Sequence, residues 1–228
     1  MEGKNTREVI AELIKSKVTV KRTVFEQSKK VLSMLKEVLE ELKQDLEQKT
    51  RCENPIVIEI KSVGKYELRL KVGGDTILFL MHSNVFDFDN SHKIYRSSYV
   101  KNNKYNAYCG TIYMYNFLSD SFKYNRVSDL GYLMGRLFVN QDRHFFTEGK
   151  GRLSFLFNDF ENAALDKKQL SGIVEEVLHQ CLVFDLSTPE FKQVEVVTLD
   201  EITQVSNELK FQTGKKLGFK FKSDESLK

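Results

Sequence analysis

Cysteine is scarce in this sequence, and the shortage excludes two kinds of structure. Three cysteines occur, Cys52, Cys109 and Cys181, and no two of them form a CxxC pair. A disulfide framework and a cysteine-based zinc site are therefore not expected. The four histidines include no close pair at metal-ligand spacing. We expect a reducing, cytoplasmic compartment, no bound metal and no cofactor.

Long apolar runs are missing as well. No segment approaches the roughly 20 apolar residues that cross a bilayer. The opening residues, MEGKN, lack the apolar core of a signal peptide. We therefore expect a soluble protein with no membrane partner.

Proline is also rare, with Pro55 and Pro189 alone, and no low-complexity linker or internal repeat is found. Hydrophobic residues make up 41% and charged residues 29% of the chain, which is typical of a folded protein and excludes a disordered one. The net charge of +3 permits an acidic partner without predicting one.

The motifs of common enzyme classes are absent too. The chain has no P-loop, no GxGxxG, no GxSxG and no HExxH. Since no catalytic constellation can be assembled from the sequence, we favour a non-enzymatic binding or assembly module. Whether any catalysis occurs stays open.

Two helices are predicted in the N-terminal quarter of the chain. Residues 6–17 form the first helix, and the β-branched run 18–20 is expected to break it. Thr23 with Glu26 three residues later is a capping-box pattern that predicts the start of a second, long helix. The apolar stripe of the first helix comprises Val9, Ile10, Leu13 and Ile14.

The second helix carries an apolar seam with two possible uses. Leucines alternate spacings of three and four along it: Leu32, Leu35, Leu39, Leu42 and Leu46. Such a seam is typical of a coiled coil and predicts a homo-oligomer with these leucines at the interface. Flanking valines widen the stripe, which fits packing on the chain's own sheet slightly better. Both interpretations stay open, and self-association through residues 23–49 is our functional hypothesis.

Residues 54–157 predict an antiparallel meander of about seven to nine strands. Alternating apolar and charged residues at 56–61 and 66–72 are typical of half-buried strands, and Gly73-Gly74 is a two-residue hairpin signal. The segment 131–138 most resembles a central strand. The remaining strands are expected at 76–81, 94–99, 108–117, 122–126, 144–147 and 152–157.

Two helices and one further strand are predicted after the meander. Asp166 is a candidate cap for the first of these helices. Valines at 194–197 predict the strand, and Thr198 with Glu201 predicts a second capped helix. The apolar face of the first helix comprises Leu170, Ile173, Val174, Val177, Leu178, Cys181 and Leu182. The face of the second comprises Ile202, Val205 and Leu209.

Together these elements predict an α+β fold in three parts. Residues 1–52 form an N-terminal helical segment, residues 53–214 an α+β core domain, and residues 215–228 a lysine-rich tail that frays.

Tyrosines and basic residues alternate between positions 95 and 126, which suggests a second function. Aromatic faces stack bases while lysine and arginine contact phosphates, so a nucleic-acid or nucleotide site is an alternative. Tyrosine also suits half-buried strands that bind no ligand. The candidate ligand-binding residues are Tyr113, Tyr115, Lys123 and Arg126.

A second alternative is a Mg²⁺-dependent nuclease. Glu148-Gly149-Lys150 matches the acidic-x-Lys triplet that such enzymes place downstream of an aspartate, and Asp129 or Asp142 is the candidate aspartate. A three-residue match arises easily by chance in a charged chain, and the glycines around Lys150 favour a hairpin turn instead.

Overall fold

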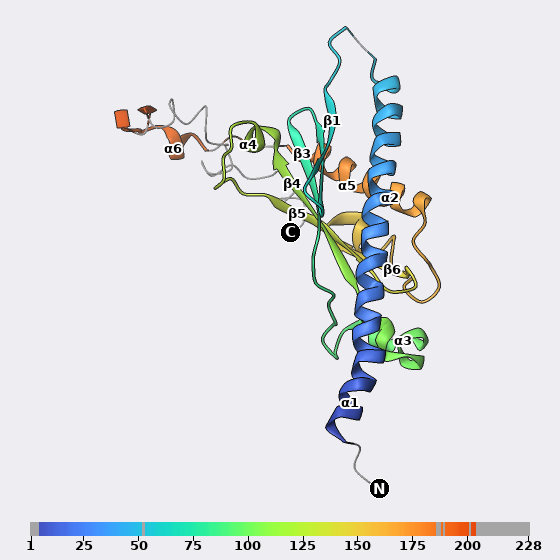
Figure 1. The fold of residues 1–228 in the computed structure, drawn as a ribbon. Coiled ribbons are helices and arrows are strands. Elements are labelled where there is room, and N and C mark those ends of the chain that lie inside the picture. The colour runs from blue at the N-terminus through green and yellow to red at the C-terminus, as the bar shows by residue number, and fades with distance from the viewer. Residues whose placement is uncertain (1–4, 52, 186–187, 189, 201, 204–228) are drawn as a thin grey trace.

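The structure is a computed structural model that describes residues 5–51, 53–185, 188, 190–200, 202 and 203. It shows an α+β fold in which six antiparallel strands form one sheet and a long N-terminal helix runs across it (Figure 1). The helices α2 (Thr19–Lys49) and α5 (Lys167–Val183) cover one face of the sheet, and that layer holds the main core.

The N-terminal helix is continuous where a break was predicted. The segments α1 (Thr6–Leu13), η1 (Ile14–Val18) and α2 (Thr19–Lys49) follow one another without a non-helical residue between them. The β-branched run is accommodated by a π-turn, in which the hydroxyl of Thr19 also donates to the carbonyl of Ile14 at 2.9 Å. Because a π-turn can lie inside an α-helix, the chain stays helical through this run, and the predicted break is wrong.

The capping box predicted at Thr23 is also wrong. The Thr23 hydroxyl donates to the carbonyl of Thr19 at 3.1 Å, inside the helix. A cap needs free backbone N–H groups, and the preceding turns already satisfy those near Thr23. The actual cap is Asn5, which forms a capping box with Glu8.

The sheet is a simple meander in which each strand pairs with its neighbours in sequence. Gly73-Gly74 forms the predicted hairpin turn, with Gly73 at φ +57° and Val72 paired with Asp75. Its strands are β1 (Ile58–Val63), β2 (Glu67–Val72), β3 (Asp75–Met81), β4 (Gly110–Leu118), β5 (Tyr132–Val139) and β6 (Phe145–Gly149).

The predicted meander of seven to nine strands is wrong in three places, and the further strand predicted at 194–197 is wrong as well. The segment 94–99 lies in the short helices η2 (Lys93–Arg96) and α3 (Ser98–Asn102). The segment 122–126 begins inside the helix α4 (Ser119–Lys123). The segment 152–157 begins inside the short helix η4 (Gly151–Ser154). The segment 194–197 begins at the last residue of the helix α6 (Phe191–Val194).

Side-chain caps explain why two of these aromatic segments turn helical. His92 accepts from the backbone N–H of Ile94, and the Ser97 hydroxyl accepts from that of Val100. Such local bonds compete with a sheet ladder, and aromatic side chains reach the core as well from a short helix. A third short helix, η3 (Lys104–Ala107), is capped in the same way by Asn103.

The C-terminal helix α5 (Lys167–Val183) begins at Asp166 as predicted, in a capping box with Gln169. Its predicted apolar face is buried except for Leu182, which is 52% exposed. Of the second predicted helix, Ile202 is exposed, while Glu201, Val205, Leu209 and the tail 215–228 lie outside the described residues.

The seam leucines pack within their own chain. Leu32, Leu35 and Leu39 are buried in the main core between α2, the sheet and α5. Leu42 and Leu46 are partly buried against the same core. Of the two uses predicted for the seam, the structure shows the one inside the chain.

A second apolar cluster covers one end of the opposite sheet face. Phe138 and Phe146 point away from the main core and pack against residues of the β3–β4 connection and against Phe160. The remainder of this sheet face lies outside the second apolar cluster.

Candidate functional site

The part of the second sheet face that lies outside the second apolar cluster carries a line of aromatic rings, here called the aromatic row. Tyr113, Tyr115 and Phe117 alternate along β4, so all three point to the same face. Their ring centroids are 6.0 Å and 6.5 Å apart in order, and Phe122 of α4 continues the line 5.4 Å from Phe117. All four side chains are half-buried, which leaves part of each ring in contact with solvent.

A groove of about 680 Å³ lies beside the aromatic row, between strands β1–β3 and α4. We call it the basic groove, because four basic side chains line it and only Glu59 and Asp120 oppose them. Strand register places the basic residues of β1 and β2 together, since residue 61 pairs with 69 and residue 59 with 71. The four basic residues are Lys61, Arg69, Lys71 and Lys123.

Two of these positive charges have carboxylate partners. Arg69 pairs with Glu67 at 2.5 Å, and Lys71 pairs with Glu59 at 3.5 Å. The guanidinium of Arg69 also lies 4.1 Å above the ring of Phe122, which fixes its plane at the end of the aromatic row.

Within the described part of the chain, neither Lys61 nor Lys123 forms an ion pair with a carboxylate. A hydrogen bond with Tyr124 is the main cause that raises the pKa of Lys123. Both ammonium groups are therefore available to an anionic ligand.

The structure separates the four predicted ligand-binding residues into two places. Tyr113 and Tyr115 lie in the aromatic row, and Lys123 lines the basic groove beside it. Arg126 is buried, with its guanidinium 5.0 Å from the ring of Tyr124. The basic residues of β1 and β2 were missed, because only strand register brings them close to residue 123.

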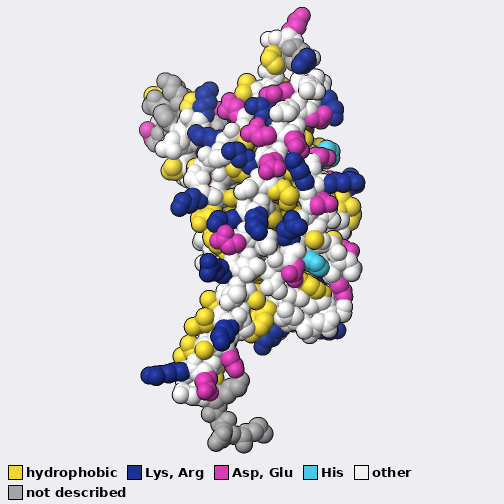
Figure 2. All heavy atoms as spheres, turned by 45° about the vertical axis from the view of Figure 1, so that its right-hand side comes forward, with side chains coloured by type: hydrophobic (Ala, Val, Ile, Leu, Met, Phe, Trp, Pro, Cys, Tyr) yellow, Lys and Arg dark blue, Asp and Glu magenta, His cyan; other side chains and the backbone are white. Residues whose placement is uncertain are grey.

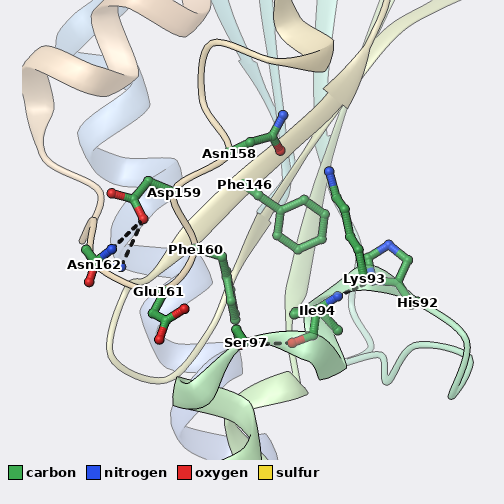
Figure 3. Close-up of a pocket in the computed structure, with 10 residues that line it drawn as sticks. All are labelled: His92, Lys93, Ile94, Ser97, Phe146, Asn158, Asp159, Phe160, Glu161 and Asn162. Atoms are coloured by element: carbon green, nitrogen blue, oxygen red, sulfur yellow. Dashed lines mark hydrogen bonds between the residues drawn. The ribbon is translucent and has the colours of Figure 1, made fainter.

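A smaller pocket of about 250 Å³ lies at the covered end of the sheet (Figure 3). Phe146 and Phe160 contribute apolar surface to it, and the side chains around them carry both signs of charge. Asp159 accepts from the side chain of Asn162 at 2.9 Å, and Glu161 accepts from a serine hydroxyl outside the pocket. These mutual contacts give the pocket no dominant charge for a ligand to recognise.

The predicted nuclease residues each have partners of their own. Glu148 pairs with Arg136 and lies 3.7 Å from the imidazole of His92. Asp129 accepts from the hydroxyl of Ser121 at 2.7 Å, and Asp142 accepts from a tyrosine hydroxyl. No group of three metal-ligating side chains occurs among the described residues.

The ammonium group of Lys150 lies near two aromatic rings. It is 5.3 Å from the ring centroid of Phe184 and 6.0 Å from that of Tyr132. The contacts of Glu148 and Lys150 therefore support a structural use of the triplet.

A further exposed surface lies on the N-terminal helix where it projects beyond the sheet (Figure 1). No residue of α1 or η1 is buried, although this stretch carries five large apolar side chains that are 40–54% exposed. Figure 2 shows hydrophobic side chains gathered on this projection, at the lower end of the view. We call these five residues the apolar stripe: Val9, Ile10, Leu13, Ile14 and Val18.

Comparison with known proteins adds no assignment. No family model, no curated protein and no solved structure matches the chain. Among the described helices, none is both long and apolar enough to span a membrane.

Proposed function

We propose that this protein is a non-enzymatic assembly module that pairs with a second copy of itself through the apolar stripe. The observation that carries the proposal is the exposure of five large apolar side chains on a helix with no buried residue. A contiguous apolar surface of this kind on a folded protein marks an interaction site. The interface lies N-terminal to the leucine seam, which the chain's own core occupies.

An antiparallel pair of helices makes the stripe complementary to itself. If Leu13 of one copy faces Ile14 of the other, Val9 faces Val18 across the two-fold axis. The same register brings Glu12 opposite Lys15 of the second copy. Opposite charges beside an apolar contact favour this register over a parallel one, which sets like charges together.

The size of the stripe predicts a weak dimer. Burying a Val, Leu or Ile side chain stabilises by about 1.5–3 kcal/mol, so the exposed half of each contributes roughly 1 kcal/mol. Two copies of five such side chains give about 10 kcal/mol, and the loss of rotational and translational freedom opposes this by about 4 kcal/mol at the low end of its range. The remaining roughly 6 kcal/mol corresponds to a dissociation constant of about 40 µM.

Sedimentation equilibrium of the full chain between 2 and 200 µM, roughly the range set by that estimate, tests the proposal. The wild type is expected to shift from monomer to dimer, and the double variant Leu13→Asp with Ile14→Asp to stay monomeric. Val127→Asp with Leu130→Asp is the matched control, because these residues are 88% and 60% exposed and lie outside the stripe. A wild type that stays monomeric throughout would refute the proposal.

A membrane surface is the competing occupant of an amphipathic helix. The polar face of the stripe's helix mixes Glu8 and Glu12 with three basic residues, and the helix has no aromatic residue, whereas interfacial helices favour Trp and Phe with a basic polar face. Binding to phosphatidylserine vesicles that Leu13→Asp abolishes, with no dimer in solution, would replace our proposal.

The cytoplasm is the compartment we propose. Cys109 and Cys181 are free thiols in buried positions, which supports a reducing environment without depending on it.

A further inference from the structure

We infer that the aromatic row and the basic groove together bind single-stranded nucleic acid. The two surfaces adjoin, since Phe122 ends the aromatic row and also lines the groove. This site is independent of the apolar stripe, which lies on a different element.

The aromatic row supplies stacking surface for bases. Tyr113 and Tyr115 have nearly parallel rings, with an interplanar angle of 18°, and both stand on a strand in the middle of the sheet. Half-buried rings held by a sheet stack bases at a low entropy cost, because their orientation is fixed before the ligand arrives. Duplex nucleic acid cannot use this surface, because its base faces are already stacked.

The basic groove supplies contacts for phosphates. Lys61 of β1 and Lys123 of α4 contribute ammonium groups that form no ion pair with a carboxylate of the described residues. Arg69 adds a guanidinium plane at the junction with the aromatic row. A volume of about 680 Å³ accommodates a short stretch of backbone, in contrast to the 250 Å³ pocket at the other end.

Charge alone does not explain such a site. Glu59 and Asp120 lie in the groove, and the net charge of the whole chain is only +3. A polyanion without bases gains little from a groove that also contains carboxylates. We therefore expect the bases to provide much of the affinity and the lysines to fix the position of the strand.

Fluorescence anisotropy of labelled 12-nucleotide uridine and thymidine oligomers with the full chain tests the inference, across a salt series. We expect binding that weakens with salt at a slope of about −1.5 to −3, since two to four phosphate contacts contribute about −0.7 each. Lys61→Glu with Lys123→Glu is expected to weaken binding at least tenfold at about 50 mM salt and to flatten the slope. Lys30→Glu with Lys36→Glu, at two exposed positions of α2, is the charge-matched control.

The tyrosine variants test the stacking step. Tyr115→Leu is expected to weaken binding by roughly 5- to 100-fold without changing the salt slope, while Tyr115→Phe retains it. Both keep an apolar side chain over the sheet, so a melting curve that matches the wild type shows that the fold is intact. The double variant Leu13→Asp with Ile14→Asp, which removes the proposed dimer, should bind the oligomers like the wild type.

Three results would overturn the inference. One is the absence of binding at about 50 mM salt, where phosphate contacts are strong. Another is equal affinity for heparin or an abasic oligomer, which would show a polyanion surface without base recognition. The third is a Tyr115→Leu variant that binds the oligomers as tightly as the wild type does.

Discussion

Gly110 at the start of β4 gives the sharpest test of how α2 packs on the sheet. A Cβ atom at Gly110 would lie 2.0 Å from Oγ and 3.0 Å from Cβ of Ser28 on α2. Gly110→Ala therefore forces the helix and the strand apart. Overpacking of this kind costs about 1–3 kcal/mol, partly offset by about 0.5–1 kcal/mol because alanine suits a strand better than glycine. We expect a net loss of about 1–2 kcal/mol.

A double-mutant cycle separates this clash from other effects. Ser28→Ala removes the 2.0 Å contact but only one helical hydrogen bond, from the Ser28 hydroxyl to the carbonyl of Val24. In the Ser28→Ala background, Gly110→Ala should cost at least about 1 kcal/mol less. The assay is urea unfolding followed by circular dichroism. Gly74→Ala is the control, because a Cβ there meets nothing within 4 Å.

The described packing of α2 on β4 would be contradicted if the Gly110→Ala variant is as stable as the wild type. It would also be contradicted if the effects of the two substitutions on the free energy of unfolding are additive. Repeating the unfolding at two protein concentrations distinguishes α2 of the same chain from α2 of an exchanged copy. In the Leu13→Asp, Ile14→Asp background, which removes the proposed dimer, we expect the midpoint to be independent of concentration, since the core is built within one chain.

Three other predictions concern buried groups. Leu39→Ala should lower the free energy of unfolding by about 2–5 kcal/mol in the same assay, since Leu39 is fully buried in the main core. Burial, and then a hydrogen bond to Asp142, raise the pKa of Tyr99, so stability should be complete below about pH 10, the unfolded value, and fall above it. Tyr99→Phe should reduce that fall. Burial raises the pKa of the Cys109 thiol. The Cys52→Ser variant should therefore react with a thiol reagent only when it unfolds. Rapid reaction of the folded variant would contradict the buried position of Cys109.

Local periodicity predicted those elements whose signals lie close in the sequence. The Gly73-Gly74 turn and the Asp166 cap both depend on residues within one turn or hairpin, and both were predicted correctly. The strand predicted for the aromatic run 94–99 was wrong, because the composition of the run does not indicate the side-chain caps at His92 and Ser97. Composition was a weaker guide there than hydrogen bonds between neighbours.

The candidate site was only partly predictable, for a different reason. Tyr113 and Tyr115 belong to one strand, so their common face follows from the alternation of a single strand. The basic groove requires the register of β1 against β2 and the position of α4 over them. No pattern within one segment contains that information, which is why Lys61 and Arg69 were missed and Arg126 was included.

Disulfide cross-linking of two single-cysteine helices tests the proposed dimer most directly. Val9→Cys and Val18→Cys, each in a Cys52→Ser background, are mixed and oxidised, then compared with either variant alone. The antiparallel register brings these two positions opposite each other, within the roughly 7 Å Cα separation that a disulfide can bridge. We predict a cross-linked product in the mixture that neither variant gives alone. Cross-linking of each variant with itself, or none in the mixture, would contradict the proposed interface.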